Sequence, residues 1–212
     1  MKRVVFITLW VLFGSLSVLV SFYPISYFLA DKPIALLLSK TAELLSNHFY
    51  MVCFYLHISF GGIALLIGWL QFSKKLRTTY LNLHRWIGKI YVLSVLISGI
   101  PGFYIAMHAS GGLSPKLGFS IGAVVWVVTT IVGFTTIRKG NVKAHKQLMM
   151  YSYAGTFGAV TLRIWLPLLI VLLGSFNEAY QIVAWLSWVP NIIITYFFIQ
   201  SINNKTQIST IN

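Results

Sequence analysis

Six apolar segments, each about 20 residues or longer, are the feature that most limits what this chain can fold into. An α-helix rises about 1.5 Å per residue, so about 20 apolar residues cross a hydrocarbon core of about 30 Å. The sequence therefore predicts membrane spans at 4–28, 49–72, 86–107, 117–137, 148–173 and 179–200. Because no linker rich in Pro, Gly or Ser separates them, we expect residues 1–212 to form one integral membrane domain. Its expected fold is all-α, a six-span transmembrane helical bundle with spans two to five as the core.

The charged residues agree with a membrane location and argue against a nucleic-acid partner. Sixteen Lys and Arg residues stand against three acidic residues, which gives a formal net charge of +13. In a soluble protein this excess would indicate nucleic-acid binding, but the apolar segments require a lipid bilayer. Most of the basic residues lie at the N-terminus, after spans two and four, and in the C-terminal tail. The positive-inside rule then predicts a multi-pass protein with both termini in the cytoplasm.

The connector between spans one and two has the pattern of a helix. Asp31 can cap a helix N-terminus and Pro33 fits a first helical turn. Apolar residues then follow at helical spacing, namely Leu37, Leu38, Leu44 and Leu45. We therefore expect a short amphipathic helix that lies on the periplasmic surface of the membrane.

Three ionisable residues are predicted to share one layer in the outer half of the membrane. Counted from Lys75, His57 lies about 27 Å above the cytoplasmic boundary. Counted from Lys89, His108 lies about 29 Å above it, and Arg163 lies at a comparable depth of about 25 Å. Ionisable groups so deep are costly and usually face the bundle interior or a cavity. His57 is therefore a ligand or an interhelical hydrogen-bond partner, and His108 is a ligand or a hydrated interfacial residue.

A second pair of histidines, His84 and His145, lies at the cytoplasmic ends of spans three and five, each directly before a cationic residue. Two histidines on each side of the membrane match the axial ligands of haem b, whose propionates need cationic partners. We expect each haem to be ligated by the two histidines on its own side. The predicted ligands and propionate contacts are His57, His108, His84, His145, Arg163 and Arg85. Ordinary solvated histidines are the alternative for His84 and His145.

Several sequence blocks resemble a known family. They are His57-x3-Gly61, Leu83-His84-Arg85-Trp86-x-Gly88-Lys89-x-Tyr91, His145-x3-Leu148-Met149-x-Tyr151-Ser152 and Thr161-Leu162-Arg163. Their order resembles the bacterial membrane proteins grouped as domain of unknown function 2306, over about residues 50–165. The resemblance implies a location in the bacterial inner membrane, but it implies no particular activity.

The paired histidines are also similar in arrangement to cytochrome b561-like and ferric-reductase-like haem cores. That resemblance implies transmembrane electron transfer by a membrane oxidoreductase or electron carrier, with a quinol or another reductant as donor. Two other functions fit the same residues: a non-catalytic accessory or lipid-contacting factor, and a His-lined pathway for a metal ion or small solute. The sequence has no Gly-rich phosphate loop, His-Glu-x-x-His motif or nucleophile elbow.

Overall fold

The described part of the chain is helical, as the sequence predicts. The computed structural model describes residues 2–211, except for the side chains of residues 2, 3, 6 and 205–211. Six segments within this part are long and apolar enough to cross a membrane. They are Ile7–Leu29, His48–Phe72, Leu81–Ala106, Leu113–Arg138, Val142–Leu173 and Phe176–Asn204. Each overlaps one predicted span, so the six-span all-α prediction is confirmed.

The chain begins with α1 (Lys2–Ser21) and three short elements, α2 (Ile25–Leu29), η1 (Ala35–Ser39) and α3 (Ala42–Ser46). The core helices are α4 (His48–Gly68), α6 (Leu81–Ala106), α7 (Leu113–Arg138) and α8 (Val142–Leu173). Between α4 and α6 lie η2 (Trp69–Phe72) and α5 (Lys74–Thr78). The sixth span consists of two helices, α9 (Phe176–Leu186) and α10 (Val189–Ile211).

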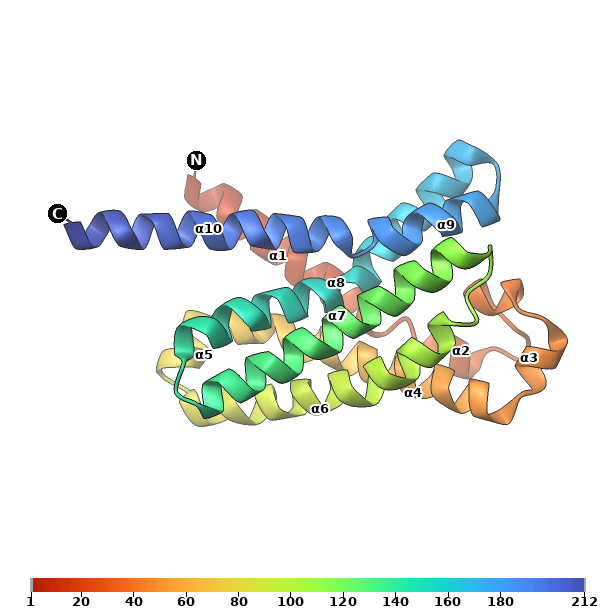
Figure 1. Cartoon of the computed structure of the whole chain (residues 1–212), viewed down its shortest axis with the longest axis horizontal. Coiled ribbons are helices and arrows are strands. Elements are labelled where there is room, and N and C mark those ends of the chain that lie inside the picture. Colours follow the sequence, from red (N-terminus) through yellow and green to blue (C-terminus); the bar gives the residue numbers. More distant parts are fainter. Residues whose placement is uncertain (1, 212) are drawn as a thin grey trace.

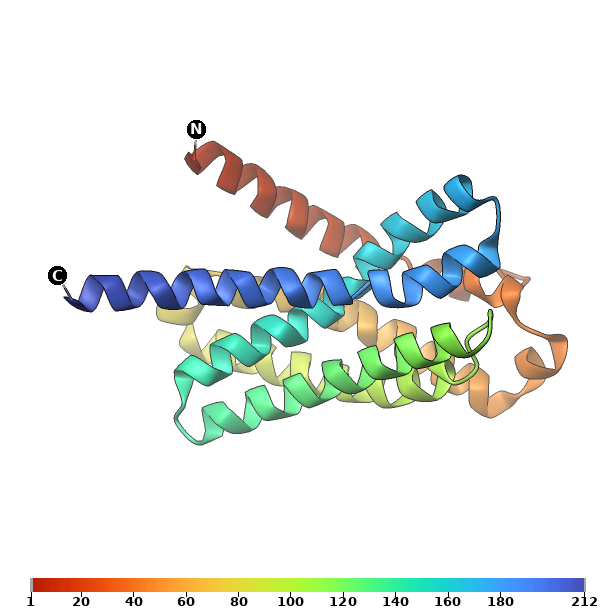
Figure 2. The same cartoon turned by 45° about the horizontal axis from the view of Figure 1, so that its top comes forward.

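The core is an antiparallel bundle of α4, α6, α7 and α8 (Figure 1). In it α4 packs against α6, α6 against α7, and α7 against α8. The helices α1 and α10 lie outside this bundle, and α1 diverges from it toward its N-terminus (Figure 2). Both termini lie at the same end as α5 and the turn between α7 and α8, which we call the α5 end. The connector with α2 and α3 lies at the opposite end, which we call the α3 end.

A network of buried hydroxyl groups joins three core helices at mid-bundle. The Tyr91 hydroxyl lies 2.7 Å from Ser152 Oγ and 2.8 Å from Thr156 Oγ1. Trp126 Nε1 donates to Thr156 Oγ1 (2.8 Å), and Thr130 Oγ1 lies 2.6 Å from Ser152 Oγ. In a low-dielectric interior an unpaired polar group is costly, so this mutual pairing holds α6, α7 and α8 in register.

The connector differs from the predicted single amphipathic helix. Asp31 does not cap a helix, because the next helical turn begins only at Ala35 and is 3-10 in form. The chain is extended at Lys40, and a second short helix, α3, starts with Thr41 as its cap. The break has a local cause: Lys40 Nζ donates to the carbonyl oxygen of His108 (2.7 Å), which fastens the connector to the loop after α6.

Candidate functional site

Three of the predicted ligands share one hydrogen-bond pattern, in which Nδ1 meets a backbone carbonyl oxygen. The pairs are His57 with Ser98 (3.0 Å), His108 with Tyr104 (3.0 Å) and His145 with Gly133 (2.8 Å). Because a carbonyl oxygen only accepts, Nδ1 carries the proton in each ring and Nε2 keeps its lone pair. No described residue forms a hydrogen bond with these Nε2 atoms. Imidazoles held in this way are oriented to bind a metal through Nε2.

The α5 end brings His84 and His145 together. His84 lies in the first turn of α6 and His145 in the first turn of α8, and the two rings interact electrostatically. Arg77 and Arg85 act on His84 in the same way. The guanidinium of Arg77 is oriented by the carbonyl oxygen of Phe72, to which Nη2 donates at 3.2 Å. Two imidazoles and two guanidinium groups thus gather where span three begins.

Two polar atoms in this part of the bundle, Gln71 Nε2 and His84 Nδ1, are sealed from solvent and have no hydrogen-bond partner among the described residues. Gln71 lies beside Gly88, one turn after His84: a Cβ added to Gly88 would find its nearest neighbour, Gln71 Oε1, at 3.8 Å. The sequence analysis assigned Gln71 no role in a site, although an amide at the end of an apolar span is a detectable signal. Unpartnered buried groups are rare in proteins and call for an explanation such as a bound ligand.

The residues at the α5 end fit a b-type haem better than a bare metal ion. No group of three or more His, Cys, Asp or Glu side chains able to hold a metal exists in the described part of the chain. Haem needs only two protein ligands, because the macrocycle supplies the remaining nitrogens, and its propionates suit a cationic neighbourhood. The donor set agrees with such a group, and a Cβ at Gly88 would meet no atom closer than Gln71 Oε1 at 3.8 Å.

At the α3 end, His57 is fitted closely against α6. Its Nδ1 is held by Ser98, and a Cβ added to Gly102 would lie only 2.6 Å from the same atom. Ser98 also donates its hydroxyl proton to the carbonyl oxygen of His57 at 2.8 Å. The interhelical hydrogen bond that the sequence analysis named for His57 is therefore present.

Arg163 lies near His57 but pairs with no carboxylate. Its electrostatic neighbours are Tyr23, Tyr27 and His57. The guanidinium carbon lies 4.3 Å from the centroid of the Tyr23 ring, and Nη1 donates to the carbonyl oxygen of Ala159 at 2.8 Å. Its Nε is sealed from solvent and has no partner among the described residues.

The structure does not bring His57 and His108 together. The His108 ring lies beside Tyr50, with the ring centroids 5.6 Å apart, and Tyr50 precedes His57 by about two turns of α4. At about 1.5 Å per residue, the two histidines therefore differ in height by about 10 Å. Two axial ligands of one iron must approach to about 4 Å, at about 2 Å for each metal–nitrogen bond.

The predicted equal height of these histidines fails for two local reasons. The predicted depth of His57 assumed one straight helix from His57 to Lys75, but α4 ends at Gly68 and the chain is extended at Ser73. The count for His108 took Lys89 as the cytoplasmic boundary, but α6 begins at Leu81, so Lys89 lies about 12 Å inside the helix. His108 itself lies just beyond the end of α6 at Ala106, in the loop that Lys40 binds.

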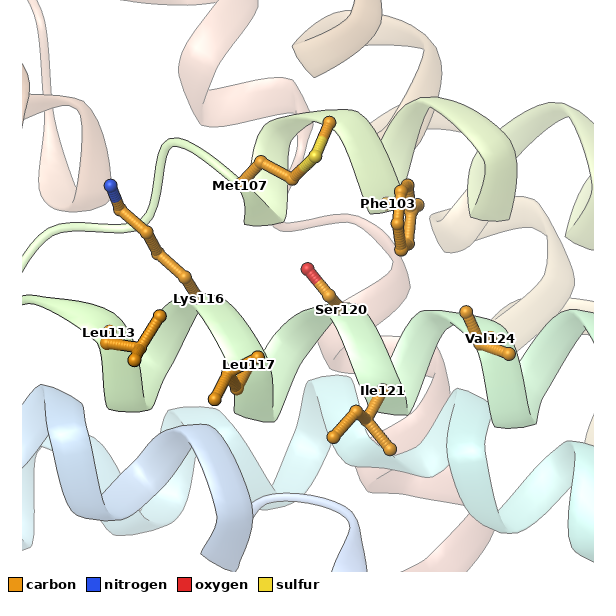
Figure 3. A pocket seen from close by; sticks show the side chains of 8 residues that line it. All are labelled: Phe103, Met107, Leu113, Lys116, Leu117, Ser120, Ile121 and Val124. Carbon is orange, nitrogen blue, oxygen red and sulfur yellow. The ribbon is translucent and has the colours of Figure 1, made fainter.

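A surface groove between α6 and α7 contains none of the predicted site residues. It measures ≈ 470 Å³ (Figure 3). Its lining is almost wholly apolar, with Ser120 and Lys116 as the polar exceptions. We therefore place the candidate chemistry at the two ends of the bundle rather than in this groove.

Comparison with known proteins agrees with the sequence blocks around these residues. No curated protein matches the chain, and no solved structure matches it. Residues 54–199, which include four of the five histidines and Arg163, match the model of a family described as predicted membrane protein (DUF2306). This match covers well over half of the sequence, and the chain therefore belongs to the DUF2306 family of predicted membrane proteins.

Proposed function

We propose that this protein is a b-type haem membrane protein that carries electrons, with haem b at the α5 end between His84 and His145. The observation that carries the proposal is the proximity of two imidazoles from the first turns of different helices, His84 of α6 and His145 of α8, beside two guanidinium groups. A bound haem would supply a one-electron redox couple whose potential depends on its ligands and on nearby charge. The earlier expectation of a second haem, between His57 and His108, is not part of this proposal.

Each residue of the site has a distinct role in the proposal. The carbonyl oxygen of Gly133 holds His145 Nδ1–H, which fixes the ring and makes Nε2 a better donor. Arg77 and Arg85 supply positive charge for the propionates, and Arg77 is preorganised by its bond to Phe72. Gly88 lies one turn from His84 on the same helix face, where an added Cβ would be in ordinary contact with Gln71 Oε1 at 3.8 Å and a longer side chain would occupy the volume beside the imidazole.

The membrane orientation and the electron donor belong to the same proposal. We place the α5 end and both termini in the cytoplasm of a bacterial cell, because the basic loops gather at that end. A C-terminal green fluorescent protein fusion should then fluoresce, and a C-terminal alkaline phosphatase fusion should be inactive. The reverse result would place haem and termini on the outer side. A quinol is the donor to test first, because it reaches the protein from the bilayer.

The test is the reduced-minus-oxidised difference spectrum of protein purified from cells supplied with haem. The wild type should show a Soret band and an α band, and His84→Ala and His145→Ala should each lose them. His48→Ala is the matched control, because His48 is an exposed histidine at the α3 end. Gly88→Leu keeps both ligands but fills the adjacent space, and should also lose the bands. A wild type without a Soret band would refute the proposal, as would double-alanine protein that keeps the wild-type spectrum.

A further inference from the structure

The groove between α6 and α7 lies where these two helices separate toward the α3 end. Deeper in the bundle they are in contact, because a Cβ added to Gly99 of α6 would clash with Val127 Cγ2 of α7. Pro101 follows within α6, and a proline inside a helix removes a backbone hydrogen bond and favours a bend. Phe103 and Met107 then line the groove and are 39% and 43% exposed. The groove is therefore bounded at its deep end and open to the lipid along its side.

Two polar side chains of α7 lie at successive depths in this groove (Figure 3). Lys116 belongs to the first turns of α7, near the membrane boundary, and its side chain extends away from Ser120. Ser120 follows four residues later, on the same helix face and about 6 Å deeper. Beyond it the lining is apolar, and Val124 lies about 6 Å deeper again. From the membrane surface inward, the groove thus presents a cation, a hydroxyl group and apolar side chains.

The protein satisfies neither of the two polar groups. Lys116 is exposed and forms no ion pair or hydrogen bond with any described residue. The four threonines of α7 donate to carbonyl oxygens three or four residues earlier, whereas Ser120 forms no hydrogen bond with any described residue. The Ser120 hydroxyl instead points across the groove toward α6 (Figure 3). An unpaired hydroxyl is costly in the membrane, because no water replaces the missing partner.

A second cation lies close to the membrane-surface end of the groove. Lys40 Nζ donates to the carbonyl oxygen of His108 at 2.7 Å, and His108 directly follows Met107, which lines the groove. No described acidic side chain forms an ion pair with Lys40 or Lys116. Two uncompensated cations favour an anionic ligand at this end of the groove.

We propose that the groove between α6 and α7 binds an anionic phospholipid, with its phosphate at Lys116, an ester carbonyl at the Ser120 hydroxyl and an acyl chain along Phe103. Phosphate, ester and acyl chain follow one another in such a lipid in the same order as the groups of the groove that bind them. The hydroxyl donates and the ester oxygen accepts. The charge of Lys40 favours a lipid with a net negative charge over a zwitterionic one. This site is independent of the haem proposed at the α5 end.

The test counts the lipids bound to the full chain by native mass spectrometry, in a non-ionic detergent that contains no phosphate. Phosphatidylglycerol and phosphatidylethanolamine with the same acyl chains are titrated separately, and oleate is titrated in a third arm. The wild type should bind one phosphatidylglycerol at least about fivefold more tightly than phosphatidylethanolamine, because one lysine near an anionic lipid contributes about this factor. Oleate has the charge and the chain but no ester, so it should also bind more weakly than phosphatidylglycerol.

Single substitutions assign the bound lipid to the groove. Lys116→Gln should bind phosphatidylglycerol about fivefold more weakly and lose most of the preference over phosphatidylethanolamine. Ser120→Ala should weaken the binding of both phospholipids by about two- to tenfold, because it removes one hydrogen bond. Lys32→Gln is the matched control: Lys32 is an exposed lysine in the connector at the α3 end and does not line the groove. It should keep the wild-type affinities.

The variants also control for misfolding. Because Lys116 and Ser120 bond to no described residue, Lys116→Gln and Ser120→Ala should unfold at the wild-type temperature in lipid-free detergent. Ser120→Phe fills the groove and should bind neither phospholipid tightly, whereas Val128→Phe adds a ring at an exposed position of α7 outside the groove and should bind both. The proposal is overturned if the wild type binds phosphatidylglycerol no more tightly than phosphatidylethanolamine or oleate. It is also overturned if Lys116→Gln keeps the wild-type preference, or if Ser120→Phe keeps the wild-type affinities.

Discussion

The mid-bundle hydroxyl network predicts an order of stability between two substitutions that each remove one hydroxyl. Tyr91→Phe breaks the bonds to Ser152 and Thr156, but both partners remain satisfied. Ser152 keeps its bond to Thr130 (2.6 Å), and Thr156 keeps its bond from Trp126 (2.8 Å). Hydrogen bonds between membrane helices contribute about 0.6 kcal/mol on average, with a maximum of about 1.7. We therefore expect Tyr91→Phe to lower the free energy of unfolding by about 1–2 kcal/mol.

Thr156→Val should cost more, although it has almost the same shape as the wild-type residue. It removes the bond from Tyr91 and also the acceptor that lies 2.8 Å from Trp126 Nε1. Trp126 is 9% exposed, so the loss of this acceptor inside the bundle costs about 1–3 kcal/mol. Added to the lost bond from Tyr91, the expected loss is about 2–4 kcal/mol.

The assay is reversible unfolding in mixed micelles, with denaturing detergent as the titrant and helical circular dichroism as the signal. Thr135→Val is the control, because this exposed threonine bonds only to its own helix, at Val132. It should change the free energy of unfolding by less than about 0.5 kcal/mol. If Thr156→Val is no more destabilising than Tyr91→Phe, the argument that unsatisfied partners dominate the cost is refuted.

Four further substitutions test close contacts and charge. Gly68→Ala should cost about 1–3 kcal/mol, because its Cβ would lie 2.5 Å from Tyr153 Cε2. Gly88→Ala, whose Cβ would meet only Gln71 Oε1 at 3.8 Å, should be nearly neutral in the same micelle titration. Gly102→Ala should displace His57 from Ser98, seen as a shift of the His57 imidazole resonances; unchanged resonances would contradict the contact. Burial and Lys116 lower the pKa of Lys40 to about 8 from 10.5, so the unfolded chain holds the proton longer. The free energy of unfolding of the wild type should therefore rise as the pH is raised from about 8 to about 10.5, and this rise should be absent in Lys40→Met. A flat profile in the wild type would contradict this prediction.

Span number and helical class follow directly from the sequence because they depend on hydropathy summed over about 20 residues. A local change in helix geometry has little effect on a hydropathy summed over so many residues. Interruptions of the helices do not show in such a sum: η2 after Gly68 and the break between Leu186 and Val189 lie inside segments of high mean hydropathy. Pro190, which follows the second break directly, is a local signal of it. The heights of single residues depend on such local details, as the start of α6 at Leu81, well before Lys89, shows for His108.

The candidate site was predictable in part for the same reason. His84 and His145 both open a helix at the α5 end, so their proximity depends only on which helix ends share a side of the membrane. The pairing of His57 with His108 needed exact heights, and these depend on where α4 and α6 end. Gln71 was assigned no role in the site because a single amide at the end of an apolar span carries no pattern of its own. Only the packed structure shows that its Nε2 is sealed without a partner among the described residues.

The polar atoms without a partner lie toward the ends of the bundle, whereas the hydroxyl network that joins the helices at mid-bundle is fully paired. At mid-bundle, each hydroxyl of the network has a protein partner, and the network can be satisfied during folding without any ligand. At both ends, polar atoms are sealed or buried without a partner, and the protein bears their desolvation cost. A ligand that supplies the missing hydrogen-bond partners removes this desolvation cost, and its binding therefore stabilises the folded protein. Haem at the α5 end should therefore raise the unfolding temperature, and it should not change the effect of Tyr91→Phe, because perturbations that share no partners act additively.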